Sequence, residues 1–280
     1  MRLVVGGVPE HFNWPFHVLA ERGLPAGIDF EWRDFPGGSG AMASALNAGE
    51  LDVALMLTEG AVAAIAKAGR FRVVSLYTQS PLVWGIHVPA ASSLRAVADV
   101  RRGRYAISRR GSGSHLMAAV HARAQGWSEP LELVEVGDLD GAVDALGGGR
   151  AEVFFWEKSM TQPLVDAGRF RRVGEFAAPW PAFVACATLG VLERGAASVR
   201  SLLDAALAAA ADVVADPGSA AAIARRYSLA PEEAAAWLAR TRWAARVGVA
   251  DELEPVARAL ADLGLVAPGF DAATAVARLG

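Results

Sequence analysis

Two segments of the chain repeat the same helix–glycine–strand pattern one hundred residues apart. Residues 45–53 (ALNAGELDV) align with residues 145–153 (ALGGGRAEV), and residues 68–73 (AGRFRV) align with residues 167–173 (AGRFRRV) at nearly the same offset. Two matching segments in the same order and at the same spacing indicate two related α/β halves. Chance similarity within an alanine- and glycine-rich chain is the alternative explanation.

Strands alternate with helices through the first part of the chain. Each apolar run rich in β-branched residues is followed by a polar or glycine-containing loop and then by a helical pattern. This alternation is typical of βαβ units and predicts a mainly parallel sheet. The predicted strands are residues 3–8, 30–35 and 52–57, and the predicted helices are residues 16–22, 42–47 and 61–67.

Two apolar stretches are predicted to carry the chain from one half to the other and back, near residues 78–90 and 180–192. We therefore expect a two-lobed α/β fold in which each lobe is a mainly parallel sheet flanked by helices. The first lobe is predicted to comprise residues 1–83 with 190–280, and the second lobe residues 84–189. After the second crossing the chain is predicted to be helical at residues 199–215, 219–227, 231–245 and 252–263.

Composition narrows the class of protein. Hydrophobic residues make up 53% of the 280 residues and charged residues 20%, which predicts a globular chain with a sizeable core. A net charge of −3 disfavours nucleic-acid binding. The single cysteine, Cys186, excludes an internal disulfide and a CxxC pair.

No membrane span or export signal is expected from the sequence as written. The longest uncharged run, residues 176–192, contains two prolines and is shorter than the roughly 20 apolar residues that a span needs. The N-terminus lacks the apolar stretch and cleavage site of a signal peptide. This predicts a cytoplasmic location, or an extracytoplasmic one if an export segment was removed.

The order of these elements resembles a known architecture. The residues that carry the resemblance are 3–8 with the loop at 9–13, 37–39, 45–57 around the core 49–53, and 108–115. With these residues the chain resembles the type II periplasmic-binding-protein fold over residues 1 to about 245. More narrowly, it resembles the solute-binding proteins of ABC importers for nitrate, sulfonates, taurine and thiamine-pyrimidine precursors.

The resemblance implies a function. It implies a protein that closes two lobes around a small molecule, for ABC-type import or sensing, with a transporter permease as a partner. Members of these families are usually exported, often as lipoproteins with an acylated N-terminal cysteine, and this sequence has neither feature.

Candidate ligand-binding residues of the first half lie in the strand-to-helix loops. In doubly wound sheets, ligands bind beyond the carboxyl ends of the strands, where helix N-termini direct free N–H groups outward. These loops offer carboxylates, a titratable ring, an amide, hydroxyls and a stacking surface. Helix capping, a tight turn and core packing are the alternative roles. The candidates are Glu10, His11, Asn13, Trp14, Gly38, Ser39, Thr58 and Glu59.

The second half contains the strongest single candidate segment, residues 108–115 (SRRGSGSH). Hydroxyls, glycines and arginines precede an apolar helix, a combination that favours binding of an anion or an amide at the helix N-terminus. A solvated loop with a serine cap is the alternative. The candidates from this segment are Arg110, Ser112, Gly113, Ser114 and His115.

Further candidates are aromatic or polar residues at the end of the repeated strand and at the crossings. An indole beside a carboxylate suits an aromatic or amine-bearing ligand, by stacking and ion pairing. Together with the acids and arginines above, these residues favour a small polar ligand, heteroaromatic or zwitterionic. Core packing is the alternative role. The residues are Trp156, Glu157, Gln79, Ser80, Trp84 and Trp180.

The sequence favours binding over catalysis. It contains no nucleophile elbow, paired-histidine zinc motif or dinucleotide fingerprint, so no catalytic residue, metal or cofactor is assigned. A cytosolic enzyme on the same fold is the alternative, either a lyase or dehydratase like those of menaquinone biosynthesis or an enzyme for a thiamine-pyrimidine precursor. In that case His11 and His115 would approach each other, with Glu10 or Glu157 as the base.

Overall fold

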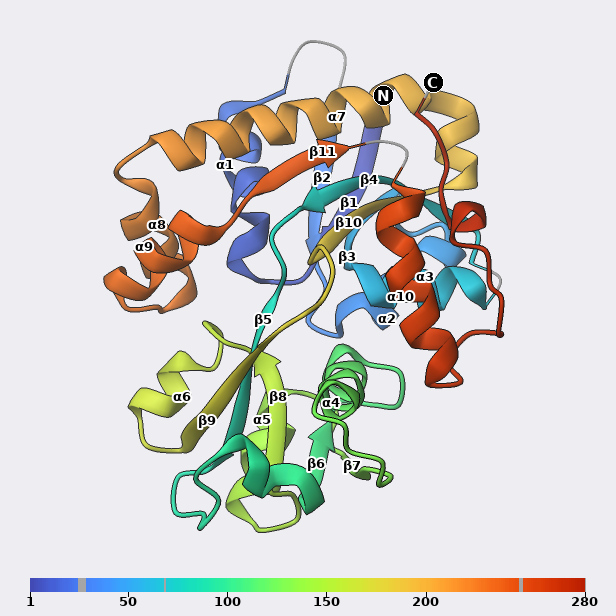
Figure 1. Cartoon of the computed structure of the whole chain (residues 1–280). Coiled ribbons are helices and arrows are strands. Elements are labelled where there is room, and N and C mark those ends of the chain that lie inside the picture. Colours follow the sequence, from blue (N-terminus) through green and yellow to red (C-terminus); the bar gives the residue numbers. More distant parts are fainter. Residues whose placement is uncertain (25–28, 68, 247–248, 280) are drawn as a thin grey trace. The chain divides into compact units, whose positions relative to one another are not determined.

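The computed structural model describes residues 1–24, 29–67, 69–246 and 249–279 (Figure 1). The chain divides into two compact units. Unit 1 comprises Met1–Pro81 and Trp180–Gly280, and unit 2 comprises Leu82–Pro179. Unit 2 is therefore a continuous segment inserted between two parts of unit 1.

Unit 1 is built on a sheet with strand order β11-β4-β10-β3-β1-β2. Strand β1 pairs in parallel with β2 and β3, whereas β10 runs antiparallel between β3 and β4, and β11 runs antiparallel to β4. The strands are β1 (Arg2–Gly7), β2 (Asp29–Asp34), β3 (Val53–Leu57), β4 (Phe71–Thr78), β10 (Phe183–Thr188) and β11 (Trp243–Arg246).

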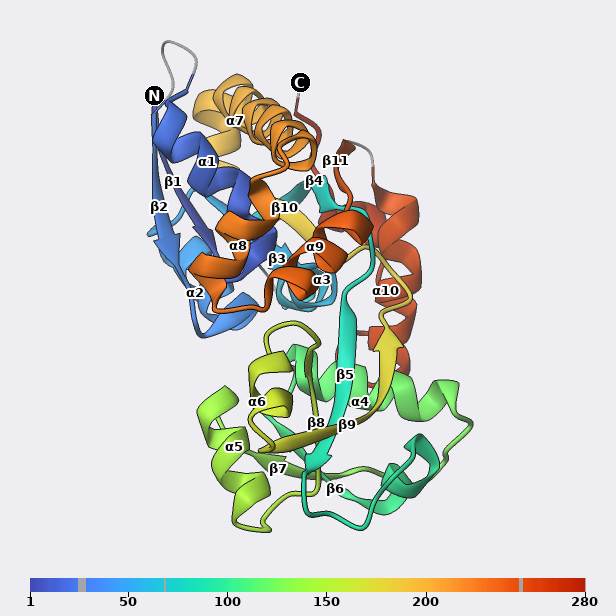
Figure 2. The same cartoon turned by 90° about the vertical axis from the view of Figure 1, so that its left-hand side faces the viewer.

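Helices cover the sheet of unit 1. Helix α1 packs against the long helix α7, and α3 packs against α2 and α10 (Figure 2). Helix α7 bends at Gly195, whose backbone is not helical. The helices are η1 (His11–Asn13), α1 (Trp14–Arg22), α2 (Gly38–Ala48), α3 (Thr58–Ala66), α7 (Leu189–Ala215), α8 (Ser219–Tyr227), α9 (Pro231–Arg240), α10 (Ala250–Asp262) and η3 (Ala272–Ala275).

Unit 2 is built on a sheet with strand order β7-β6-β8-β5-β9. Strand β6 is parallel to β7 and β8, and β5 runs antiparallel between β8 and β9. The elements are β5 (Val83–Pro89), η2 (Val97–Arg102), β6 (Arg104–Ile107), α4 (Gly113–Ala124), β7 (Glu132–Glu135), α5 (Leu139–Gly147), β8 (Val153–Glu157), α6 (Gln162–Asp166) and β9 (Phe170–Ala177). A buried cluster between α5 and the sheet consists of Ala106, Ala142, Ala145, Leu146, Ala151, Phe154 and Phe170.

The repeated sequence segments have the same local structure in both units. In unit 1 the carbonyl of Ala45 accepts hydrogen bonds from the N–H groups of residues 50 and 51, and in unit 2 the carbonyl of Ala145 accepts them from residues 150 and 151. Both helices are followed by a glycine with positive φ, Gly49 at 76° and Gly149 at 70°. The matched segments therefore end their helices and enter their strands in the same way.

The acidic residue before each repeated strand has the same role in both units. The Asp52 carboxylate accepts a hydrogen bond from the backbone N–H of Val4 (2.9 Å), and the Glu152 carboxylate accepts one from Arg104 (3.1 Å). In each sheet the repeated strand lies between one parallel and one antiparallel neighbour. This shared bonding argues against chance similarity and for a structural duplication.

The expected α/β class with C-terminal helices is confirmed, and three details differ. Both sheets are mixed, because β5 and β10, which lie next to the crossings, run antiparallel to the repeated strands. The sequence analysis placed residues up to 189 in the second lobe, whereas β10 pairs with β3 and β4 in unit 1. The predicted helix at 231–245 ends at Arg240 and is followed by strand β11.

No described helix has the length and apolar character that a membrane span requires.

Close packing at the end of β1 gives a first testable prediction. A Cβ atom on Gly7 would lie 2.5 Å from the ring of Trp32 and 2.6 Å from the side-chain nitrogen of Asn13. We expect Gly7→Ala to lower the free energy of unfolding by about 1–3 kcal/mol, because this interior has no room for a methyl group. Urea unfolding measures the change.

The matched control is Gly147→Ala at the end of α5, where an added Cβ would meet no atom within 4 Å. This variant is expected to be neutral or to gain up to about 1 kcal/mol, because alanine favours helix over glycine. Equal stabilities of the two variants would contradict the packing argument.

Candidate functional site

The predicted ligand-binding residues divide between the two units, and most follow the carboxyl ends of parallel strands. Unit 1 holds Glu10, His11, Asn13, Trp14, Gly38, Ser39, Thr58, Glu59, Gln79, Ser80 and Trp180, and unit 2 holds Trp84, Arg110, Ser112, Gly113, Ser114, His115, Trp156 and Glu157.

Side chains at the start of α3 fix the turn that follows β3. The Thr58 hydroxyl donates a hydrogen bond to the carbonyl of Pro181 (2.6 Å), so it does not cap the helix. The Ser39 hydroxyl, on the first turn of α2, accepts a hydrogen bond from the N–H of Leu57 (3.1 Å). Gly60 permits this approach, because a Cβ there would lie 2.6 Å from the Cβ of Ser39. These contacts join α2, α3 and the segment before β10.

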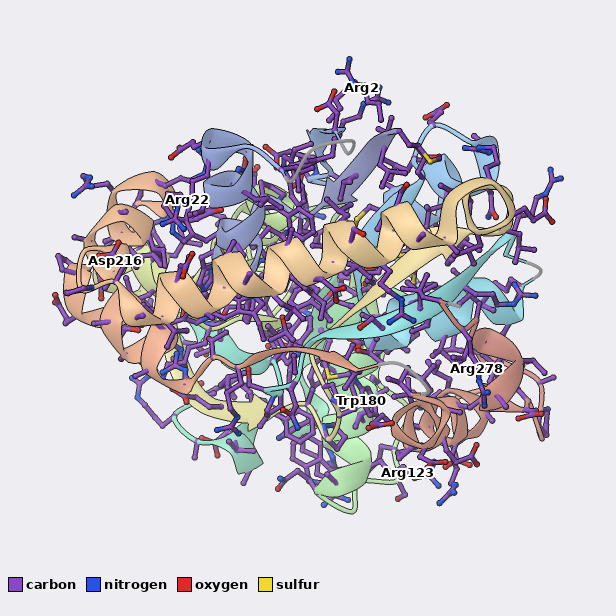
Figure 3. All side chains as sticks on the ribbon, turned by 90° about the horizontal axis from the view of Figure 1, so that it is seen from above. Arg2, Arg22, Arg123, Trp180, Asp216 and Arg278 are labelled. Atoms are coloured by element: carbon purple, nitrogen blue, oxygen red, sulfur yellow. The ribbon has the colours of Figure 1, made fainter. Side chains whose placement is uncertain are left out.

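Glu59 is a buried carboxyl group in the first turn of α3. The indole Nε1–H of Trp180, labelled in Figure 3, donates a hydrogen bond to a Glu59 carboxylate oxygen (2.8 Å), and both side chains are at most 5% exposed. Burial raises the pKa of Glu59 to about 7, although its own backbone N–H and Trp180 oppose the shift. Among the described residues, no cation pairs with Glu59.

The first loop, residues 8–13, is closed by hydrogen bonds within itself. The Asn13 side chain donates to the carbonyl of Val8 (2.7 Å) instead of capping α1, and its Nδ2 packs over Gly7. Glu10 and Trp14 are partly exposed on either side. These hydrogen bonds hold the loop in one conformation.

His11 is fully buried beside Trp237 of α9, with ring centroids 4.2 Å apart. Burial and, to a smaller extent, the charge of Arg240 lower the pKa of His11 to about 3. The imidazole is therefore neutral at physiological pH and does not act as an imidazolium general acid.

Gln79 and Ser80, which precede the first crossing, form hydrogen bonds with the segment that leads into β11. The N–H of Gln79 donates to the carbonyl of Arg242 (2.8 Å), and the hydroxyl of Ser80 accepts from the N–H of Arg242 (3.1 Å). The side chain of Gln79 is exposed and Ser80 is buried. Sequence reasoning missed this connection because it predicted a continuous helix through Arg242.

In unit 2, the hydroxyls of the segment 108–115 stabilise the loop at the start of α4. The Ser112 hydroxyl caps α4, accepting from the N–H of His115 (3.4 Å), and lies 3.0 Å from the Ser114 hydroxyl. Ser114 in turn accepts from the N–H of Ser108 (3.0 Å). Both hydroxyls therefore position the loop and the first turn of α4, in which Gly113 is the first helical residue.

The two remaining candidates of this segment differ in exposure. The Nδ1 atom of His115 accepts a hydrogen bond from the N–H of Gly111 (2.9 Å). Burial and the charge of Arg110 lower the pKa of His115, while Glu135 opposes the shift. Arg110 itself is exposed and forms an ion pair with Glu135 (3.5 Å), so it is directed to a surface carboxylate.

At the end of β8, Glu157 lies directly opposite Trp84 of β5 in the antiparallel ladder. Both are buried, and a Glu157 carboxylate oxygen accepts a hydrogen bond from the N–H of Met160 (2.7 Å). The indole Nε1 of Trp84 has no hydrogen-bond partner among the described residues. Trp156 is partly exposed and stacks on Phe154, with ring centroids 5.1 Å apart.

Aromatic residues far along the chain hold the first loop, and the sequence analysis did not identify them. The hydroxyl of Tyr77 and the indole N–H of Trp243 both donate to the carbonyl of Phe12 (2.9 Å each). Trp237 packs edge-on against the Phe12 ring. No local sequence signal marks these residues, because the fold alone brings them to the loop.

Solved structures with the same chain course cover nearly the whole protein. The Candida albicans CA3427 gene product, described as exhibiting the generic periplasmic-binding-protein fold, is 22% identical with a TM-score of 0.89, and the match covers 99% of this chain and 96% of that one. This chain has the type II periplasmic-binding-protein fold. In addition, residues 84–176 match the family of Ca3427-like PBPs.

Two further structures of this fold carry ligands. The alkanesulfonate-binding protein SsuA from Xanthomonas axonopodis pv. citri, bound to MOPS, is 19% identical with a TM-score of 0.84, covering 99% of this chain and 98% of that one. The ligand-binding component of an ABC-type import system from Staphylococcus aureus, with zinc bound, is 13% identical with a TM-score of 0.79, covering 99% and 97%. No curated protein sequence matches the chain.

Within the described part of this periplasmic-binding-protein fold, no group of three or more His, Cys, Asp or Glu side chains could hold a metal ion.

The raised pKa of Glu59 predicts how stability depends on pH. Between about pH 4.5 and 7 the folded protein keeps a proton on Glu59 that the unfolded chain releases, so stability falls as the pH rises through this range. The loss is about 3 kcal/mol at 1.36 kcal/mol per pKa unit. The Glu59→Gln variant keeps an acceptor for Trp180 and has no carboxyl to titrate.

Urea unfolding from pH 4.5 to 8 should therefore show the Gln variant gaining stability relative to the wild type as the pH rises. The exposed Glu254→Gln substitution on α10 is the control and should follow the wild type. Parallel wild-type and Glu59→Gln curves would show that folding does not shift the pKa of Glu59.

Proposed function

We propose that this protein binds a small polar ligand by closing its two units around it, for ABC-type import or for sensing. The observation that supports this most directly is the fold, which matches binding proteins over 99% of the chain. The alkanesulfonate-binding protein SsuA and the ligand-binding component of an ABC-type import system share this fold. Loops after parallel strands in both units supply the ligand contacts in this proposal.

Glu59 and Trp180 favour a ligand that carries an N–H donor or an ammonium group. A buried carboxyl without a cationic partner is stabilised by a donor or a positive charge, and the indole beside it offers an apolar surface for stacking. In unit 2, Glu157 lies opposite Trp84 in the β5–β8 ladder, which also places an acid near an indole, although no hydrogen bond joins their side chains. The pairs support a heteroaromatic or zwitterionic ligand over a simple inorganic anion.

The start of α4 supplies the complementary preference in unit 2. The N–H groups of its first turn have no partner within the helix, and the helix dipole places positive potential there. The unpartnered, buried indole N–H of Trp84 adds a second hydrogen-bond donor to unit 2. A carboxylate or carbonyl oxygen of the ligand would be suited to these donors.

A thermal-shift screen tests the ligand class. Pyrimidines, amino acids, sulfonates and nitrate are added one at a time, and a true ligand raises Tm because it binds only the folded state. We expect stabilisation by compounds that carry an N–H donor. Stabilisation by nitrate or simple sulfonates alone would contradict the preference.

For any compound that stabilises the protein, Glu59→Gln should weaken binding at least about tenfold, which corresponds to 1.4 kcal/mol. Calorimetry compares this variant with Glu254→Gln, which should bind as tightly as the wild type. If both variants bind the compound as tightly as the wild type, Glu59 does not contribute to binding.

Closure of the two units and chemical conversion of the compound are tested by separate measurements. Small-angle scattering with and without the stabilising compound should show a smaller radius of gyration when it is bound. Mass spectrometry of the incubated compound should show it unchanged. An unchanged radius of gyration would contradict closure. Conversion of the compound would show that the protein is an enzyme and not only a binding protein.

A further inference from the structure

Three buried ring nitrogens lie unpaired where the first loop meets α9. Neither nitrogen of His11 nor the indole Nε1 of Trp237 has a hydrogen-bond partner among the described residues, and each atom exposes less than 1 Å². The two rings are in contact, with centroids 4.2 Å apart and planes tilted by 60°. Buried polar atoms are nearly always paired, so a cluster of unpaired ones in one place calls for an occupant.

The surrounding groups do not supply the missing partners, and one of them, the Tyr227 hydroxyl, is itself buried and unpaired among the described residues. The nearby carbonyl of Phe12 already accepts two hydrogen bonds, from Tyr77 and Trp243, which occupy both of its lone pairs. The other sides of the His11 and Trp237 rings face the aromatic rings of Phe12 and Tyr227. Aromatic rings thus surround a few unpaired polar atoms, a combination that small-molecule sites also show.

The charges around the cluster nearly cancel. The positive charge of Arg240 lowers the pKa of His11, and the guanidinium of Arg226 lies over the ring of Tyr227. The negative charges of Glu10 and Asp34 raise the pKa of Tyr227, whereas the positive charge of Arg226 lowers it. Two cations face two carboxylates, and His11 itself is neutral, so the cluster favours a neutral guest over an ion.

The unpaired atoms also specify the hydrogen bonds of that guest. The indole of Trp237 only donates, and neutral His11 has one nitrogen that donates and one that accepts. An amide group matches this set, because its carbonyl oxygen accepts from the indole N–H while its own N–H donates to the bare imidazole nitrogen. A carboxylate lacks the donor, and an ammonium lacks the acceptor.

We propose that His11 and Trp237 form a subsite for a neutral amide group, open-chain or within a ring, of the bound ligand. The assignment rests on the proposed binding function and extends the site to α9. Because the three nitrogens are covered, the guest enters when α8 and α9 shift from the first loop. The short link between these helices contains Ser228, which has a positive φ of 53° and is the only such non-glycine residue among those described.

The test uses acetamide as the smallest neutral amide and acetate as its charged counterpart of similar shape. Each is titrated into protein labelled with ¹⁵N at its tryptophans, and the indole N–H resonances are followed. We expect acetamide to shift the Trp237 resonance in a saturable way, and acetate to leave it unchanged. No shift, equal shifts at all indoles, or a larger shift with acetate would overturn the proposal.

Two matched variants separate binding from stability. Trp237→Phe removes an unpaired N–H, so Tm should stay the same or rise while the affinity for acetamide falls at least tenfold. Trp127→Phe, in unit 2, is the matched control: it removes an indole N–H outside this cluster, so the affinity for acetamide should be retained. If Trp237→Phe does not fold, sequential assignment of the wild-type protein identifies the same resonance and the titration still decides.

Water is the competing occupant. A high-resolution structure without ligand that shows a water bonded to the Trp237 indole, and still shows it in acetamide-soaked crystals, would overturn the proposal. Its failure is distinguishable from failure of the proposed function. A compound from the thermal-shift screen that closes the units, yet binds Trp237→Phe as tightly as the wild type, would leave the binding function standing without this subsite.

Discussion

The backbone pairing of β10 is the interaction on which unit 1 depends. Residues 183–187 are buried, and β10 pairs with β3 on one edge and with β4 on the other. Unpaired backbone groups in such a position would cost as much as lost hydrogen bonds, so the strand must occupy the middle of the sheet. It thereby brings Trp180 and Pro181 to the start of α3, where they contact Glu59 and Thr58.

If Glu59 binds the ligand as proposed, its buried carboxyl sets binding and stability against each other in this unit. Its ionised form is disfavoured by burial and is supported only by its own backbone N–H and by Trp180. A cationic side chain beside Glu59 would stabilise its ionised form. It would also occupy the position that a hydrogen-bond donor of the proposed ligand needs. Unpaired polar groups kept for a ligand are therefore expected to lower the stability of the free protein.

The sequence predicted local patterns well and long-range contacts poorly. Residues 219–227 form α8 as expected, and the repeat at 45–53 and 145–153 was visible because the same local bonding recurs. Strand β11 was missed because apolar residues after α9 continue a helical spacing, while pairing with β4 decides its state. Trp237 and Trp243 could not be assigned to the first loop, since only tertiary packing brings them to Phe12.

The insertion of unit 2 into unit 1 has a consequence for the order of folding. Unit 2 is continuous in sequence, so all its strands are synthesised before β10. Strands β1 to β4 must meanwhile wait with a gap in the middle of their sheet, exposing unpaired edges at β3 and β4. During synthesis the nascent N-terminal segment is therefore the part that most needs protection by a chaperone, although it is the first to emerge.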